Sequence, residues 1–251
     1  MKSLTTDNKQ TAYGNLCSLF YDTTKQYASA KEVNFYSQFI EQKHGRVLEA
    51  MSGSGRLQIP LMQRGYLVDG VDNSQSMLAR CRQRCTQLQL NPKLFEQSLE
   101  TFASPYTYTN VTIAVGSFQL LSNRATALTA LKNIHAHMET GGNLLIDLFI
   151  PDISPDNRTE CIVRINETTT LKATTRYIVH ESEQLIDTFC LYTLTINGII
   201  EKQENEFMQI TWYTDESITQ LLNEAGFNII HFYNETLRTT GPSRIVHTQA
   251  R

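Results

Sequence analysis

The chain has 251 residues, of which 41% are hydrophobic, and a formal net charge of −3. A chain of this length can bury a core without disulfides or metals, so we expect one domain over 1–251. The slight acidity excludes the basic stripe that binding to a phosphate backbone requires, and we expect no nucleic-acid partner. No stretch approaches the roughly 18 uninterrupted apolar residues of a membrane span, and no membrane partner is expected.

The cysteines and the first residues indicate the cellular location of the protein and whether it binds a metal. The five cysteines are odd in number and scattered, which is typical of a protein in the reducing cytoplasm. The segment 1–7 lacks an apolar core, so we expect no signal peptide. Cys81 and Cys85 lie one helical turn apart, but no further ligands complete a zinc site. We therefore expect both to pack in the interior, with no bound metal.

The first 150 residues predict a helical segment followed by alternating strands and helices. Residues 12–43 carry apolar side chains at helical spacing and should form an N-terminal helical cap. Within 45–150, strands are predicted at 46–50, 66–71, 94–97, 111–115 and 143–150, and helices at 57–64, 74–88 and 126–138. The last of these helices is expected to stop at Gly141-Gly142. Such alternation predicts a parallel sheet with helices on both faces.

The pattern changes in the segment 155–213, which has no helical signal and is rich in Thr, Ile, Val and Tyr. It predicts three or four antiparallel strands, with a tight hairpin at Asn197-Gly198. We expect this insertion to act as a lid or as the interface of a homodimer. The part 214–251 should complete the core, with a helix that opens at Thr214 and two final strands.

The turn after the first predicted strand carries the first functional signal. From Glu49 to Arg56 it reads EAMSGSGR, in which Gly53 and Gly55 allow a tight turn and close approach of a ligand to bare backbone. In an open α/β sheet the ligand lies beyond the carboxyl ends of the strands. Gln58 stands where the dinucleotide fingerprint needs a third glycine, and the Lys-Ser/Thr of a P-loop is missing.

Two acidic residues refine the ligand class. Asp72 ends the second predicted strand 19 residues after Gly53, where a carboxylate can accept hydrogen bonds from both hydroxyls of a ribose. Glu49 would repel a pyrophosphate in the first turn but would attract a ligand with an ammonium and a sulfonium. Charge alone thus favours S-adenosylmethionine over NAD.

The same turn, from Val47 to Arg56, resembles motif I of the class I S-adenosylmethionine-dependent methyltransferases. The usual form is acid-x-Gly-x-Gly-x-Gly, and Met51 replaces its first glycine. Further segments that resemble the family follow in order at 70–78, 97–99, 116–121, 141–147 and 224–227. The resemblance implies a Rossmann-like fold with a seven-stranded, mostly parallel sheet whose last strand is antiparallel, plus the inserted antiparallel β-subdomain.

The resemblance also implies a set of residues around S-adenosylmethionine and its product S-adenosylhomocysteine. Asp72 would take the ribose, Asn73 and Met77 would flank the adenine, and the loop after the fourth strand would lie beside the transferred methyl. The full set of cofactor candidates is Glu49, Ala50, Met51, Gly53, Gly55, Arg56, Asp72, Asn73, Met77, Gln97, Ser98, Leu99, Gly116, Ser117 and Phe118.

Candidates for the acceptor site are less well defined, and for each of them core packing or surface exposure stays an open alternative. They are Tyr13, Tyr21, Phe118, Gln119, Arg164, Tyr177, Trp212 and Tyr213. His231 is either a base or a core histidine. Methyl transfer needs alignment more than a strong base, so no catalytic residue is assigned.

The expected activity is transfer of a methyl group to nitrogen or oxygen of a small polar molecule. Three alternatives remain: a protein or RNA methyltransferase, a non-catalytic or dimerising module that kept the fold, and an NAD oxidoreductase. The acidic charge disfavours the first, an intact Asp72 the second, and Gln58 with Glu49 the third. The acceptor itself cannot be named from the sequence.

Overall fold

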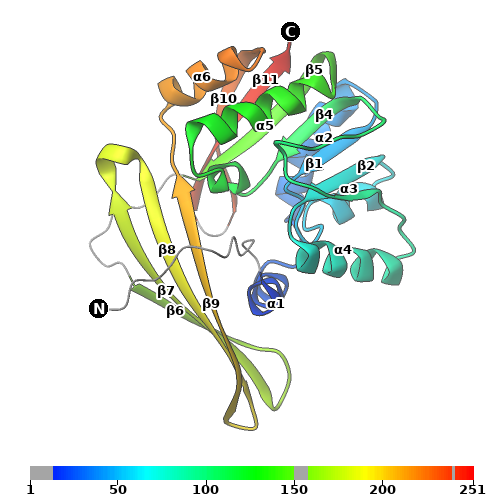
Figure 1. Cartoon of the computed structure of the whole chain (residues 1–251). Helices are drawn as coiled ribbons and strands as arrows, with labels where there is room; N and C mark the ends of the chain where they lie inside the picture. The colour runs from blue at the N-terminus through cyan, green and yellow to red at the C-terminus, as the bar shows by residue number, and fades with distance from the viewer. Residues whose placement is uncertain (1–13, 150–157, 239–240) are drawn as a thin grey trace.

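The computed structural model of the protein describes residues 14–149, 158–238 and 241–251. Their centre is a seven-stranded sheet in the order β10-β11-β5-β4-β1-β2-β3 (Figure 1). Its strands are β1 Val47–Ala50, β2 Val68–Asp72, β3 Leu94–Glu96, β4 Tyr108–Ile113, β5 Met138–Phe149, β10 Phe227–Arg238 and β11 Gly241–Ala250. Neighbours pair in parallel, except that β11 runs antiparallel to β5 and β10. This confirms the sheet that the resemblance implies.

Helices cover both faces of the central sheet and create two apolar cores. On one face lie α2 Ala30–Gln42, α3 Gln58–Gln63 and α4 Gln75–Gln87; on the other lie α5 Arg124–Ala136 and α6 Asp215–Glu224. Side chains alternate along β1, so that Val47 packs in the core of α2 and α3 while Leu48 packs in the core of α5 and α6. Burial on both faces accounts for the continuous apolar runs of the central strands.

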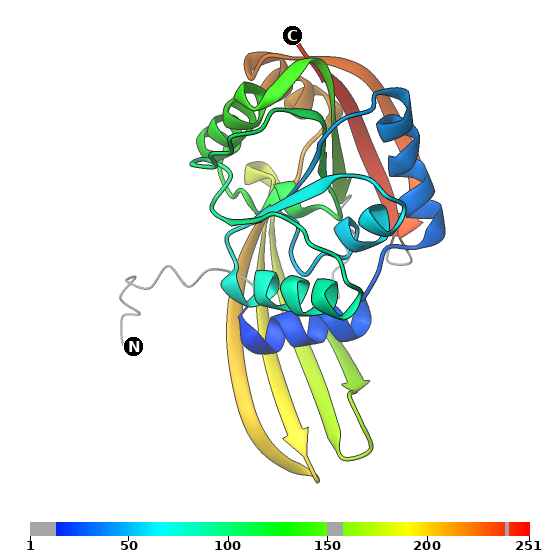
Figure 2. The ribbon, with the colours of Figure 1, turned by 90° about the vertical axis from the view of Figure 1, so that its right-hand side faces the viewer.

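A second, four-stranded antiparallel sheet is inserted between β5 and α6. It consists, in chain order, of β6 Arg158–Arg164, β7 Thr169–His180, β8 Leu185–Ile196 and β9 Ile199–Thr211, with the short 3-10 helix η2 Glu181–Glu183 before β8. Figure 2 shows it extending away from the core. Asn197 and Gly198, with φ of 51° and 79°, form the turn between β8 and β9, as predicted.

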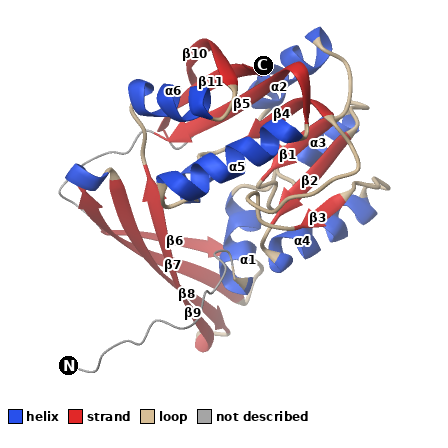
Figure 3. Cartoon of the chain, turned by 45° about the horizontal axis from the view of Figure 1, so that its top comes forward, coloured by secondary structure: helices blue, strands red, loops and turns tan. Residues whose placement is uncertain are grey.

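Helix α1 Asn15–Thr24 lies between the second sheet and α4 (Figure 3). Its apolar side packs on the sheet, where the rings of Phe20 and Tyr192 are 5.7 Å apart. Its polar side faces α4, where the carboxylate of Asp22 lies 3.4 Å from the guanidinium of Arg80. The helix therefore joins the inserted sheet to the core beside the first turn.

Two predicted elements are corrected by the structure. The single helical segment 12–43 is two helices, because the chain breaks at 25–29, where Ser29 caps α2 by accepting from the amide of Glu32. The helix predicted at 126–138 ends at Ala136, and Gly141-Gly142, the predicted stop signal, lies inside β5. A Cβ at Gly142 would come within 2.8 Å of a backbone oxygen, so this glycine serves close packing of backbone rather than a helix end.

Other helix limits follow the prediction. Ser74 caps α4 by accepting from the amide of Met77, and Thr214 caps α6 in a capping box with Ser217. Cys81 and Cys85 are buried beside Ile59. In the described part of the chain, no helix is long and apolar enough to cross a membrane. Tyr13 and Ile150 lie outside the described residues.

Candidate cofactor site

A pocket of about 470 Å³ lies beyond the carboxyl ends of β1, β2 and β4, where an open α/β sheet binds its ligand. The sequence-predicted residues that line it are Tyr21, Glu49, Met51, Gly53, Arg56, Asp72, Asn73, Met77, Gln97, Ser98, Leu99 and Ser117. They come from α1, the end of β1 and the turn after it, the end of β2, the start of α4, and the loops after β3 and β4. The fold therefore brings most of the predicted cofactor set to one place.

The turn after β1 is shaped by three residues with positive φ, which are Met51, Gly53 and Gly55. Met51 has φ of 57°, a conformation that favours glycine, and it stands where the family's motif has its first glycine. Gly53 has φ of 56°, and a Cβ there would meet only the tip of Met77 at 3.4 Å. The backbone at Gly53 is thus open to a ligand.

Asp72 is held rigidly at the end of β2. One carboxylate oxygen accepts from the amide of Gly53 at 2.8 Å, and the other accepts from the amide of Ser74 at 2.8 Å. The backbone of Asn73 gives the carboxylate a third hydrogen bond, and because a carboxylate can accept about four, it retains capacity for a ligand hydroxyl. Burial raises the pKa of Asp72, and these amide hydrogen bonds oppose that rise.

The charge around the first turn is dominated by acids. Glu49 follows Val47 on the same side of β1 and therefore points toward α2 and α3, where it is 4% exposed. One of its oxygens is buried and has no hydrogen-bond partner among the described residues. Arg56 lies nearby, but both of its terminal nitrogens bind the carboxylate of Glu32 on α2. The guanidinium charge is therefore balanced before any ligand binds.

The loop after β3 forms one wall of the pocket. The amide of Gln97 donates to the backbone oxygen of Asp72 at 3.1 Å, and its side-chain oxygen accepts from the amide of Ala103 at 2.7 Å. These bonds fix Ser98 and the buried Leu99 beside the end of β2.

The loop after β4 carries two consecutive residues with positive φ, Val115 at 59° and Gly116 at 72°. Such a conformation is costly for a β-branched residue. Asp147 on β5 holds the loop, because its carboxylate accepts from the amide of Val115 at 3.1 Å and its backbone oxygen accepts from the amide of Gly116 at 2.9 Å. Val115 lines the pocket.

Several predicted residues support the pocket without lining it. Ala50 and Phe118 are fully buried, and a Cβ at Gly55 would strike the sulfur of Cys81 at 2.6 Å. Gln119, in the 3-10 helix η1 Ser117–Leu120, donates to the backbone oxygens of Phe149 and Thr211 at 3.1 and 3.0 Å. This side chain ties the inserted sheet to β5.

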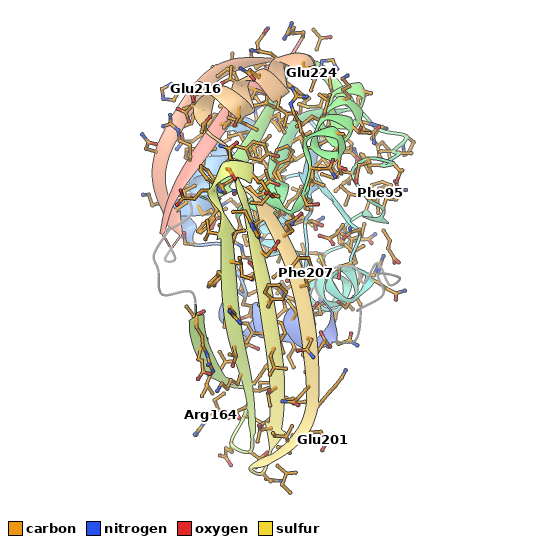
Figure 4. The ribbon with its side chains drawn as sticks, turned by 60° about the vertical axis from the view of Figure 1, so that its left-hand side comes forward. Phe95, Arg164, Glu201, Phe207, Glu216 and Glu224 are labelled. Atoms are coloured by element: carbon orange, nitrogen blue, oxygen red, sulfur yellow. The ribbon has the colours of Figure 1, made fainter. Side chains whose placement is uncertain are left out.

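The remaining predicted acceptor residues are spread over the inserted sheet and its junction with α6. Arg164 is exposed toward the same end of that sheet as Glu201 (Figure 4), and Tyr177 is half-buried on β7. Tyr213 stacks on Phe118 at 5.6 Å between ring centroids, and burial raises the pKa of its hydroxyl to about 12. Within the described residues, its hydroxyl and the indole nitrogen of Trp212 are buried without a hydrogen-bond partner.

His231 is exposed on the edge strand β10, 4.4 Å from the ring of Tyr233, and does not line the pocket. It is therefore not the core histidine of the alternative interpretation.

The sequence analysis missed a second group of lining residues, which lie on β2, in the loops and at the start of α5. They are Ser52, Val71, Glu100, Ala114, Val115, Leu120, Leu121, Ser122, Asn123 and Thr126. Ser52 and Glu100 are neighbours of residues already singled out and could have been included. Leu120 and Leu121 end the segment 116–121 that resembles the family, whereas those from 122 to 126 carry no motif, and only the fold brings them to the pocket.

The sheet order, the ligand edge and the acidic first turn define the chain as an α/β cofactor-binding protein. Residues 47–142 match the model of a methyltransferase domain family. A protein of Geobacillus sp. (strain WCH70) with a provisional methyltransferase name is 23% identical over 84% of this chain and 83% of its own length. A second such protein, from Bacillus subtilis (strain 168), is 25% identical over 55% of this chain and 57% of its own length.

Solved structures share the whole architecture. A sugar N-methyltransferase from Streptoalloteichus sp. ATCC 53650 superposes with a TM-score of 0.79 at 17% identity, covering 100% of this chain and 99% of the other. An amino pentose methyltransferase from Micromonospora echinaspora, bound to S-adenosylmethionine, gives 0.74 at 18% identity over 97% and 100%. Residues 47–142 thus match a methyltransferase domain, and the chain has the fold of these S-adenosylmethionine-dependent methyltransferases.

Proposed function

We propose that the protein transfers a methyl group from S-adenosylmethionine to nitrogen or oxygen of a small polar molecule. The observation that carries the proposal is the acidic pocket at the ligand edge of a methyltransferase fold. Among the described residues that line it, Glu49, Asp72 and Glu100 are acidic, and the one basic side chain, Arg56, is bound to Glu32. Such a site suits a ligand with an ammonium and a sulfonium and disfavours a pyrophosphate.

The residues present fit this cofactor. Glu49 keeps a buried oxygen to which no described residue donates, and a ligand cation would satisfy it. Asp72 is preorganised to accept from the ribose hydroxyls, and Gly53 leaves its backbone open to close approach. When bound, S-adenosylmethionine supplies a methyl carbon on a sulfonium, so that transfer to the acceptor leaves the neutral thioether and releases the acceptor's proton.

The chain itself has to align the acceptor and exclude water. Orientation of this kind can contribute about 7–11 kcal/mol to a reaction. Asp72 and the turn after β1 fix one side of the pocket, and the strained loop at Val115, held by Asp147, fixes the other. Tyr21 closes the pocket from α1.

A small acceptor is supported by the size of the pocket. The cofactor and the acceptor have to share about 470 Å³, which leaves little room for a macromolecular segment. Hydroxyl and amide groups from Ser117, Ser122 and Asn123 line the part next to the loop after β4, and they suit a polar partner. The two sugar methyltransferases of the same fold act on molecules of this kind.

A screen of amines, hydroxy acids and amino sugars, read by release of S-adenosylhomocysteine, tests the proposal. We expect at least one small polar class to raise the rate of release well above that of the protein with cofactor alone. If unmodified protein or RNA substrates alone raised it, the acceptor would not be a small molecule. Asp72→Ala serves as the control for background hydrolysis.

A further inference from the structure

Acidic side chains outnumber basic ones around the first turn, and Glu49 has no ion pair with a described residue. Glu32 holds Arg56 through both carboxylate oxygens, and Arg56 acts on Glu49 through its charge rather than through a hydrogen bond. Glu49 receives a backbone hydrogen bond from Gln58 on one oxygen, while the other is buried and has no partner in the described part of the chain. At 4% exposure, the side chain has little contact with bulk water, so a missing partner is costly.

The groups that face Glu49 come from every element around it. They are Arg56 from the turn, Glu32 from α2, Asp72 from β2, Tyr21 from α1 and Cys81 from α4. Two of the five are further carboxylates and only one is a cation. A charge on Glu49 in the free protein would therefore be buried and would be repelled by Glu32 and Asp72.

We infer that Glu49 is a carboxylic acid in the free protein and gives up its proton when a cationic ligand enters the pocket. The inference rests on the proposed function, because the ligand it concerns is S-adenosylmethionine. The O–H bond of Glu49 breaks, the proton passes to the solvent buffer, and the resulting carboxylate faces the ligand's positive charge. Glu49 thereby makes recognition of the cation depend on pH.

The electrostatics agree with this geometry. Burial, partly opposed by Arg56 and reinforced by Glu32, raises the pKa of Glu49 to about 8. A ligand cation beside the carboxyl lowers that value again, and the difference appears as released protons. Below pH 8 the affinity should therefore increase with pH, by up to about tenfold per pH unit.

Titration calorimetry of the full chain with S-adenosylmethionine, in buffers of different ionisation enthalpy, measures the released protons directly. At pH 6.5 the ligand's own ammonium, with a pKa of about 7.7–8.0, stays protonated and contributes little. We expect about one proton released by the wild-type chain. The probe 5′-methylthioadenosine lacks both the sulfonium and the ammonium and should release none.

Two matched variants test whether the proton released on binding comes from Glu49. Glu49→Gln keeps the shape of the protonated side chain and should abolish the release, whereas Glu100→Gln removes another lining carboxyl and should retain it. If the Glu49→Gln variant bound too weakly to titrate, the wild-type contrast between the two ligands would decide. Proton release that survives in Glu49→Gln, or tight binding without release, would overturn the inference. Failure of the wild-type chain to bind S-adenosylmethionine would instead overturn the proposed function.

Discussion

At the scale of single residues, Met51 holds a backbone conformation that usually belongs to glycine. Its φ of 57° costs an L-residue roughly 1–2 kcal/mol. We expect Met51→Gly to be more stable than Met51→Ala by about 1 kcal/mol, although alanine normally exceeds glycine. Comparing these two variants cancels the loss of the methionine side chain. Urea unfolding checks the order, and a more stable alanine variant would show that the strain is absent.

Asp72 carries the clearest prediction for binding. Loss of its charge-assisted hydrogen bonds should weaken S-adenosylmethionine binding by at least ~2 kcal/mol, or about 30-fold in Kd, in Asp72→Ala. The carboxylate also anchors the amides of Gly53 and Ser74, so thermal unfolding of the variant has to accompany the titration. An unchanged Kd in a folded variant would remove Asp72 from the site.

At the scale of elements, the ion pair between Glu32 and Arg56 joins α2 to the turn after β1. Glu32 is 1% exposed and Arg56 is 8% exposed, so removing one partner leaves an uncompensated buried charge. We expect Glu32→Gln to lower the free energy of unfolding by about 3 kcal/mol. Glu41→Gln changes an exposed carboxylate on the same helix, where it accepts from Tyr66, and should cost less than ~1 kcal/mol. Equal effects in urea unfolding would contradict the account.

The elements also show which structural features the sequence can reveal. Strand and helix alternation, the Asn197-Gly198 turn and the helix starts at Ser74 and Thr214 depend on neighbouring residues, and these predictions are confirmed. The break within 12–43 was missed because the apolar spacing continues through Tyr27. That ring is instead exposed and contacts Arg84, 4.4 Å from its centroid.

Long-range pairing explains the rest of what was missed. Glu32 and Arg56 are 24 residues apart, and nothing in the sequence says that they bind each other. Without that pair, Arg56 looks like a free cation for the ligand. The positive φ of Val115 likewise depends on Asp147, 32 residues away, because β-branched side chains rarely adopt it alone.

At the scale of the whole molecule, stability should depend on pH through the buried Glu49. Its pKa is raised above the unfolded value of 4.5 to about 8, so the folded state holds the proton longer. The associated stability is complete below pH 4.5 and is lost as the pH rises toward 8. We expect Glu49→Gln to gain stability relative to the wild type across this range. A difference between the two that does not change with pH would show that Glu49 is ionised throughout.

His247 should give stability the opposite dependence on pH. Burial, with a contribution from His231, lowers its pKa below 6.5, so stability is lost as the pH falls below that value. Replacing it with Gln should flatten the acid limb of the stability profile, and thermal unfolding between pH 5 and 7 checks this. An unaltered acid limb would assign that loss to other groups.

The class of ligand is the claim on which the account depends most directly. Isothermal titration of the full chain with S-adenosylmethionine, S-adenosylhomocysteine and NAD separates the possibilities in one series. The acidic pocket around Glu49 and Asp72 predicts micromolar or tighter binding of both sulfur compounds and no measurable binding of NAD. Micromolar binding of NAD, with neither sulfur compound bound, would contradict it.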